Sequence, residues 1–368
     1  MEITIVAGAR PNFMKISPII KAIEKLKTEQ KPISYRLIHT GQHYSAALSD
    51  TFFDELQIPK PNKNLDVKSG TQAEQTASIM IAFEKELAEN RPDFVLVVGD
   101  VTSTMACAIV TKKANIPLIH VEAGIRSGDR TMPEEINRMV TDSITDYFFT
   151  TSEKANQNLI DEGHSKEKIF FVGNVMIDTL LKNLNRIEKP TFWSDFNLKP
   201  KGYFLLTLHR PSNVDKGSSF AELLRTIVSH AGDTPIIFPV HPRTQQVLEA
   251  ITSEFKNLHV VEPQGYLNFI YLLKNAKAIL TDSGGITEEA SILNVPCLTF
   301  RNSTERPETC TLGTNVLVAN NIEKITASFQ RLNNDEWQQA QEIPLWDGKA
   351  SERIIENLVE IYYSKKGN

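Results

Sequence analysis

The chain has few cysteines and no long apolar run. Only Cys107, Cys297 and Cys310 occur among its 368 residues, and no two of them form a Cys-x-x-Cys pair. This spacing argues against a disulfide framework and against a cysteine-based metal cluster. No apolar stretch approaches the ~18 residues that a membrane-spanning helix requires, and the apolar run after Met1 is too short for a signal peptide and lacks its basic flank. We therefore expect a cytoplasmic protein without a membrane partner.

An excess of positive charge is also missing. The 40 Lys and Arg residues are outnumbered by 45 Asp and Glu residues, which gives a net charge of −5 and a sequence pI near 6.0. Nucleic-acid-binding proteins usually present a basic stripe, so we expect no nucleic-acid partner. The eight histidines offer no plausible set of metal ligands, and the sequence therefore predicts no metal cofactor.

Glycines are scarce where a dinucleotide-binding protein needs them. The first predicted strand is followed by GARPNFMK (8–15), in which Gly8 is the only glycine. The three-glycine fingerprint is absent, which argues against NAD as a cofactor. The segment instead contains Arg10 and Lys15, two cations at a helix start, where positive charge is unfavourable unless an anion is close. We interpret the pair as phosphate-facing; a salt-bridged surface pair is the alternative.

Short β-branched apolar runs alternate with amphipathic helical patterns along the whole chain. Continuous apolar strands of this kind predict an α/β fold of parallel sheets with helices on both faces. The length favours two domains, which we place at 1–172 and 176–345, with a linker or surface loop over 186–202. Residues 350–368 could pack on either domain, which includes packing back on the first. Strands are predicted at 3–7, 34–39, 94–98, 117–121, 146–150, 169–172, 203–208, 235–240, 259–261, 278–281 and 297–300, and helices at 16–26, 72–89, 102–114, 220–230, 266–274, 287–293 and 351–363.

The polar loops follow the carboxyl ends of these predicted strands. Open parallel sheets bind their ligands beyond those ends. We therefore expect two Rossmann-like, doubly wound domains that face each other across a cleft, with most of the polar loop residues directed into it.

The segment AILTDSGGITEEAS (278–291) is the most informative one. Gly284 and Gly285 have no side chains, so a ligand can approach the backbone closely. The first N–H groups of the following helix lack internal partners and lie beside a partial positive charge, which predicts a phosphate site. Glu288 or Glu289, one turn further on, could accept hydrogen bonds from sugar hydroxyls. Together these features indicate a sugar nucleotide; the alternative is an ordinary turn with solvated glutamates.

Charged residues are concentrated after the third and fourth predicted strands, 94–98 and 117–121. Asp100 stands at the end of a buried strand, where it either serves a ligand or caps the next helix. Glu122 follows another strand directly, in a position where a carboxylate is usually buried or ligand-facing. Glu134 and Arg138 are spaced as an i,i+4 pair on a helix that begins at Pro133, so part of this charge is structural.

Two His-Arg pairs follow strands in the second half of the chain. LHRPSNVD (208–215) contains His209 and Arg210, and PVHPR (239–243) contains His241. His209 could donate a proton to a leaving phosphate, and Arg210 could neutralise that phosphate. A histidine with a purely structural hydrogen bond is the alternative, but the repeated position favours a functional one.

In this order the motifs from GARPNFMK to TERPE, over roughly residues 3–310, resemble the non-hydrolysing UDP-N-acetylglucosamine 2-epimerases. The resemblance implies a GT-B-like architecture, a homodimer, and a reaction on a UDP-sugar that needs neither NAD nor a metal. It further implies reversible inversion at C2 through elimination and re-addition of UDP, by way of a glycal, to supply surface polysaccharides.

The resemblance also assigns roles to residues. Asp100, Glu122 and Glu134 would be the acid/base carboxylates, Arg138 would support them, and His209 would assist the leaving phosphate. The predicted UDP-binding residues are Arg10, Lys15, Arg210, His241, Ser283, Gly284, Gly285 and Glu289. Four alternatives stay open: a hydrolysing epimerase, an epimerase of a modified sugar such as a diacetamido uronic acid, a GT-B glycosyltransferase, and an inactive sugar-nucleotide sensor.

Overall fold

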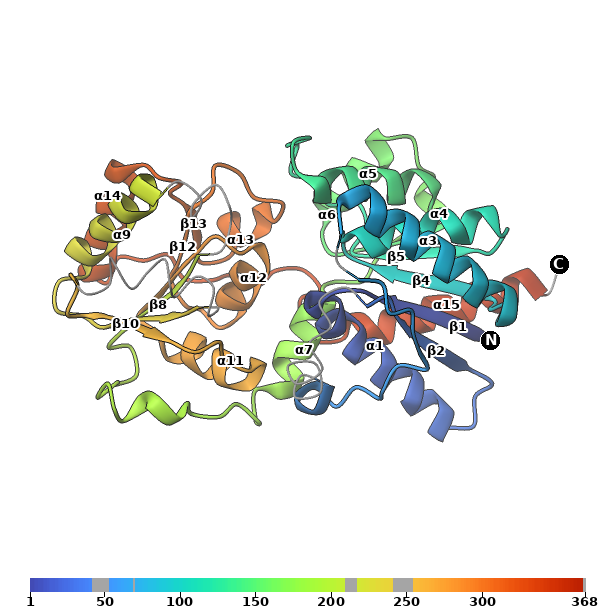
Figure 1. The fold of residues 1–368 in the computed structure, drawn as a ribbon, viewed down its shortest axis with the longest axis horizontal. Coiled ribbons are helices and arrows are strands. Elements are labelled where there is room, and N and C mark those ends of the chain that lie inside the picture. Colours follow the sequence, from blue (N-terminus) through green and yellow to red (C-terminus); the bar gives the residue numbers. More distant parts are fainter. Residues whose placement is uncertain (42–52, 69, 209–216, 241–253, 367–368) are drawn as a thin grey trace. The chain divides into compact units, whose positions relative to one another are not determined.

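The computed structural model describes residues 1–41, 53–68, 70–208, 217–240 and 254–366 (Figure 1). The chain forms two compact units. Unit 1 comprises Met1–Lys182 and Pro344–Asn368, and unit 2 comprises Asn183–Ile343. Each unit is built on one parallel sheet. No helix among the described residues combines the length and the apolar character that crossing a bilayer requires.

Unit 1 contains a seven-stranded parallel sheet in the order β3-β2-β1-β4-β5-β6-β7. The middle strand β4 is buried along its whole length, because helices cover both faces. Helices α3, α4 and α5 lie over one face, and α1 and α15 pack together over the other (Figure 1). The strands are β1 (Glu2–Ala7), β2 (Ser34–His39), β3 (Lys63–Asn64), β4 (Phe94–Val98), β5 (Leu118–Val121), β6 (Tyr147–Thr150) and β7 (Ile169–Phe171), and the helices are α1 (Arg10–Thr28), α3 (Gln72–Glu89), α4 (Thr102–Lys113), α5 (Pro133–Ile144), α6 (Glu153–Asp161), α7 (Val175–Asn183) and α15 (Ala350–Lys366).

Unit 2 repeats this plan with a six-stranded parallel sheet in the order β10-β9-β8-β11-β12-β13. Helices α9 and α14 pack together, as do α12 and α13 (Figure 1). Its strands are β8 (Phe204–Thr207), β9 (Ile236–Pro239), β10 (Leu258–Val261), β11 (Ala278–Thr281), β12 (Cys297–Thr299) and β13 (Asn315–Leu317), and its helices are α9 (Gly217–Ala231), α11 (Tyr266–Asn275), α12 (Gly284–Ile292), α13 (Pro307–Thr311) and α14 (Ile322–Asn333). Two doubly wound parallel sheets confirm the predicted α/β class.

Side chains of α7 explain why unit 1 extends beyond residue 172. The Thr179 hydroxyl donates to the Met14 carbonyl of α1 at 2.6 Å. The buried Asp178 carboxylate accepts the amides of Ala350 (3.0 Å) and Ser351 (2.8 Å) at the start of α15. These bonds join α7 to α1 and to α15, which places α7 in unit 1 together with the returning segment Pro344–Asn368.

Candidate active site

Loops from neighbouring strands meet at the carboxyl edge of the unit 1 sheet. Strands β1, β4 and β5 are adjacent, so the residues that follow them lie at one edge. The buried Asn12 joins two of these loops: its Oδ1 accepts the amides of Gly8 (3.0 Å) and Ala9 (3.1 Å), and its Nδ2 donates to the Val98 carbonyl (3.2 Å). The start of α1 is thereby fixed against the end of β4.

Glu122 is held in an unusual backbone conformation directly after β5. Its φ of +73° lies in the left-handed region, which non-glycine residues adopt mainly where the surrounding structure imposes it. Its side chain is 6% exposed and forms a salt bridge with the buried Lys15 ammonium. Gly99 leaves room for this pair, because a Cβ there would lie 2.7 Å from Lys15 Nζ. Lys15 is therefore not part of an exposed surface pair.

Arg138 of α5 connects the loop after β4 to its own helix. Its Nε (3.0 Å) and Nη2 (2.6 Å) both donate to Asp100 Oδ2, and its Nη1 donates to Glu135 Oε2 at 2.7 Å. The arginine is 6% exposed. The sequence predicted an i,i+4 pair with Glu134, but the structure pairs Arg138 with Glu135 at i,i+3. The reason is that Glu135 lies on the buried face of α5, whereas Glu134 is exposed.

Glu135 also organises the loop that precedes α5. Its carboxylate accepts the amides of Ser127 (3.0 Å) and Gly128 (2.9 Å). Burial raises the pKa of Glu135, but these amides and Arg138 outweigh it and hold that pKa below its ordinary value. Glu135 is therefore an ionised residue that fixes Arg138. Glu134, in the first turn of α5, is the solvent-facing carboxylate of the pair.

The Ser-Gly-Gly segment of unit 2 follows β11 and opens α12: Ser283 is the N-cap, and Gly284 and Gly285 are the first two residues of the helix, which begins three residues before the predicted start at 287. The Ser283 side chain makes no capping bond to the helix, so it does not satisfy the first N–H groups of α12. A Cβ at Gly285 would meet no atom within 4 Å, and one at Gly284 would lie 3.4 Å from Arg301 Nη1. This end of α12 has the open backbone and the partial positive charge that suit a phosphate.

The two glutamates of α12 are buried, with Glu288 at 1% and Glu289 at 2% exposure. The alternative of solvated glutamates is therefore wrong. Glu289 Oε1 accepts the Tyr266 hydroxyl at 3.0 Å, and Glu288 forms a salt bridge with Arg306. Burial, with a further contribution from the neighbouring Glu288, raises the pKa of Glu289 to about 8.

Comparison with known proteins identifies the family of the chain. The sequence pattern of the family described as UDP-N-acetylglucosamine 2-epimerase matches residues 24–359. The chain belongs to this family. It is 44% identical to the UDP-N-acetylglucosamine 2-epimerase of Methanocaldococcus jannaschii over 97% of this chain and 99% of that one.

Solved structures of the 2-epimerase family have the same fold. The crystal structure of the Methanocaldococcus jannaschii UDP-GlcNAc 2-epimerase in complex with UDP-GlcNAc and UDP has a TM-score of 0.86, covering 98% of this chain and 100% of that one at 44% identity. The Neisseria meningitidis UDP-GlcNAc 2-epimerase bound to UDP-GlcNAc has a TM-score of 0.88 at 30% identity, with 98% and 100% coverage. A further relative, 38% identical over 98% of this chain and 100% of its own length, is the UDP-2,3-diacetamido-2,3-dideoxy-D-glucuronate 2-epimerase of Pseudomonas aeruginosa. The predicted GT-B-like class agrees with these neighbours.

The remaining predicted site residues of this 2-epimerase family member lie partly inside and partly outside the described residues. Arg10 is the exposed first residue of α1. His209, Arg210 and His241 lie outside the described residues, so their roles stay predictions. Within the part of the chain that the structure describes, no group of three or more His, Cys, Asp or Glu side chains could hold a metal ion.

Asn12 and Glu135 were not predicted as site residues, although the sequence around each of them contains an indication of its role. Asn12 is the third residue of α1, the position from which a side chain can reach back to the start of a helix. Glu135 shares one helical face with Arg138 and Asp142, at i, i+3 and i+7, and all three are buried. The burial pattern of α5 thus distinguishes its two consecutive glutamates.

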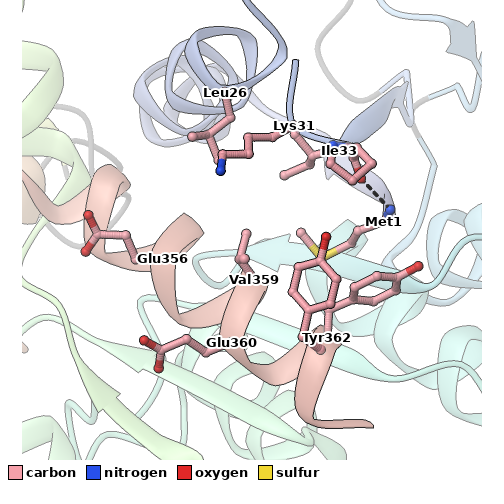
Figure 2. Close-up of a pocket in the computed structure, with 10 residues that line it drawn as sticks. Met1, Leu26, Lys31, Ile33, Glu356, Val359, Glu360 and Tyr362 are labelled. Atoms are coloured by element: carbon pink, nitrogen blue, oxygen red, sulfur yellow. Dashed lines mark hydrogen bonds between the residues drawn. The ribbon is translucent and has the colours of Figure 1, made fainter. Parts of the chain in front are cut away.

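A cavity of about 340 Å³ lies elsewhere in unit 1. It is lined by residues that precede β1 and β2, among them Met1 and Ile33, and by Val359 and Tyr362 of α15 (Figure 2). The amino ends of these strands form the sheet edge opposite to the one where Asp100 and Glu122 lie. The cavity is therefore not part of the candidate active site.

We predict that Glu289→Gln removes a pH-dependent loss of stability. Because the folded protein keeps the Glu289 proton up to a pKa of about 8, against an ordinary value of 4.5, stability is fully present below pH 4.5 and is lost as the pH rises through 8. The variant should match the wild type at low pH and exceed it at pH 9, by on the order of 1–3 kcal/mol.

Urea unfolding without UDP, followed from pH 5 to pH 9, measures this difference. Glu254→Gln is the control, because the pair that Glu254 forms with Arg225 is exposed, and such pairs contribute little. Parallel pH profiles for the wild type and Glu289→Gln would contradict the prediction.

Proposed function

We propose that the chain catalyses the reversible C2 epimerisation of UDP-N-acetylglucosamine to UDP-N-acetylmannosamine. The observation that best supports this is the state of Glu122, a buried carboxylate in a left-handed conformation that is paired with Lys15. It follows the strand next to the one that Asp100 follows. Two carboxylates at neighbouring strand ends suit a reaction that must move a proton at one carbon from either face.

The chemistry explains the need for several acids and bases. The C2 proton of the sugar lies beside an acetamido group, which does not acidify it as a carbonyl would. In the non-hydrolysing route, UDP leaves C1 with the bonding electron pair while a base removes the C2 proton, which gives a 2-acetamidoglucal. A proton then returns to C2 on the opposite face and UDP adds again to C1. Asp100, Glu122 and Glu134 are the proposed proton carriers, with Arg138 holding Asp100.

Binding of UDP throughout the intermediate is the second requirement. The open N-terminus of α12, with Ser283, Gly284 and Gly285, supplies amides for the diphosphate. Glu289 accepts hydroxyls of the ribose, and Arg10 supplies positive charge. In this proposal Lys15 acts through Glu122, because its ammonium binds that carboxylate; it keeps the local charge balanced as UDP departs. His209 is the proposed proton donor to the leaving phosphate.

The relatives support N-acetylglucosamine more strongly than a modified sugar, because the identity to this chain differs between them. The relative that is 44% identical is a UDP-N-acetylglucosamine 2-epimerase, whereas the diacetamido-glucuronate 2-epimerase is 38% identical. A modified UDP-sugar is therefore the second candidate substrate. We further propose a cytoplasmic homodimer that feeds surface polysaccharide synthesis, as the resemblance to the family implies.

Proton NMR of the protein with UDP-N-acetylglucosamine in D2O tests the proposal. We expect deuterium at C2 together with a UDP-linked manno isomer, because the proton that returns comes from exchangeable groups of the protein. Release of free N-acetylmannosamine and UDP would instead identify a hydrolysing epimerase. Exchange only with the UDP-linked diacetamido uronic acid would identify the modified sugar as the substrate.

A further inference from the structure

His120 is a fully buried histidine that faces two hydrogen-bond acceptors. It lies on β5, two residues before Glu122, and its side chain is 0% exposed. Its Nδ1 is 2.6 Å from Asp142 Oδ1, and its Nε2 is 2.8 Å from the Gly99 carbonyl oxygen. A neutral imidazole has one N–H donor, so it would direct a lone pair at one of these oxygens.

The surroundings of Asp142 determine where the protons lie. Its second oxygen, Oδ2, accepts Arg126 Nη1 at 2.7 Å and the Gly124 amide at 3.0 Å. Both partners of Oδ2 are N–H donors and one of them is a guanidinium, which is the environment of an ionised carboxylate. Asp142 is therefore a carboxylate, and a carboxylate cannot supply the proton that His120 Nδ1 needs. Each of the two ring nitrogens of His120 must therefore carry a proton, which makes the ring an imidazolium.

The same ion pair touches both turns of the candidate active site. His120 binds the carbonyl of Gly99, which has a φ of +66° and immediately precedes Asp100. Asp142 binds the amide of Gly124, two residues after Glu122. Since Asp142 belongs to α5, one buried pair joins this helix to the loops after β4 and β5.

We propose that His120 is a positioning residue for the epimerisation: as an imidazolium paired with Asp142, it holds the turns that place Asp100 and Glu122. This inference rests on the proposed function. Its charged partner is Asp142, whose other oxygen binds Arg126, and Arg126 also pairs with Glu162 at 2.6 Å. Loss of the charge on His120 leaves either the Gly99 carbonyl or residue 142 without its N–H donor, so the connection between the two turns is broken.

Nitrogen-15 NMR of histidine-labelled protein tests the charge. We expect both His120 ring nitrogens to show the shifts of protonated nitrogens at neutral pH, with the resonances assigned by their loss in His120→Gln. In Asp142→Asn the imidazolium loses its counter-ion, and we expect one ring nitrogen to become unprotonated. A neutral His120 in the wild type would overturn the proposal. This measurement does not depend on activity.

Kinetics of Asp142→Asn test the positioning role. We expect kcat for C2 epimerisation to fall about a hundredfold, as for other small displacements of catalytic groups, while KM changes little. Asp146→Asn is the matched control. Asp146, which directly precedes β6, also accepts a side-chain cation and a backbone amide, from Lys112 Nζ (2.6 Å) and Leu118 (2.8 Å), but at the amino ends of the strands. The control should lose stability and keep its kcat.

The outcomes separate this inference from the proposed function. No epimerisation of any UDP-sugar by the wild type would overturn the proposed function and the positioning role with it. An active wild type whose kcat is unchanged in Asp142→Asn, or falls no further than in Asp146→Asn, would overturn the positioning role alone. A selective fall in kcat together with loss of the His120 charge supports it.

Discussion

Replacing Glu122 with glutamine is expected to slow C2 epimerisation by about a thousandfold, within the range for loss of a general acid or base. Glutamine has nearly the same shape, but it cannot exchange a proton with the sugar. The Lys15 ammonium, which now binds the Glu122 carboxylate, would face a neutral amide. Deuterium incorporation at C2 in D2O measures the rate, and calorimetric titration with UDP should show an affinity within a few-fold of the wild type.

Glu86→Gln is the matched control for this variant. Glu86 is also a buried glutamate of unit 1, 3% exposed, and its Oε1 accepts Arg36 Nε at 2.5 Å. Its replacement breaks a comparable ion pair between β2 and α3, so it should lower stability and leave turnover intact. Near-normal turnover by Glu122→Gln would remove Glu122 from the mechanism, and an equal loss in both variants would make its role structural.

Replacing Arg138 with methionine is expected to reduce both activity and stability. The side chain is 6% exposed and binds Asp100 and Glu135, so its removal leaves the buried Glu135 without its cation. Loss of one partner of a buried pair costs about 3 kcal/mol, and Asp100 loses the two bonds that orient it. We expect turnover to fall about a hundredfold. Urea unfolding and the C2 exchange assay measure the two effects.

Arg138→Lys separates charge from geometry. Lysine keeps the positive charge but cannot direct separate N–H groups at two carboxylates as a guanidinium does. It should recover most of the stability and little of the activity. The control is Arg36→Met, which removes a partly exposed arginine from the Glu86 pair and should leave turnover unchanged. Full activity in Arg138→Lys would show that charge alone suffices at this position.

The local sequence determined most of the strands and helices and the glycine-containing start of α12. Apolar β-branched runs located β1, β2, β4 and β11 to within a residue, since a buried parallel strand has to be apolar on both faces. The Ser-Gly-Gly segment that opens α12 and the start of α5 at Pro133 could also be predicted from the local sequence. Strands β3 and β13 were missed, because two or three residues are too few to show a period.

Tertiary structure alone decided which charged groups became partners. Lys15 and Glu122 are 107 positions apart, and no local sequence pattern links residues so distant in the chain. They meet because β1, β4 and β5 are neighbours in the sheet. The choice of Glu135 over Glu134 depended on which face of α5 is buried. The sequence by itself predicted a two-domain α/β protein and proposed a phosphate site at the Ser-Gly-Gly segment. The pairing of its buried charges followed from strand order, because strand order sets which loop ends share one edge of a parallel sheet.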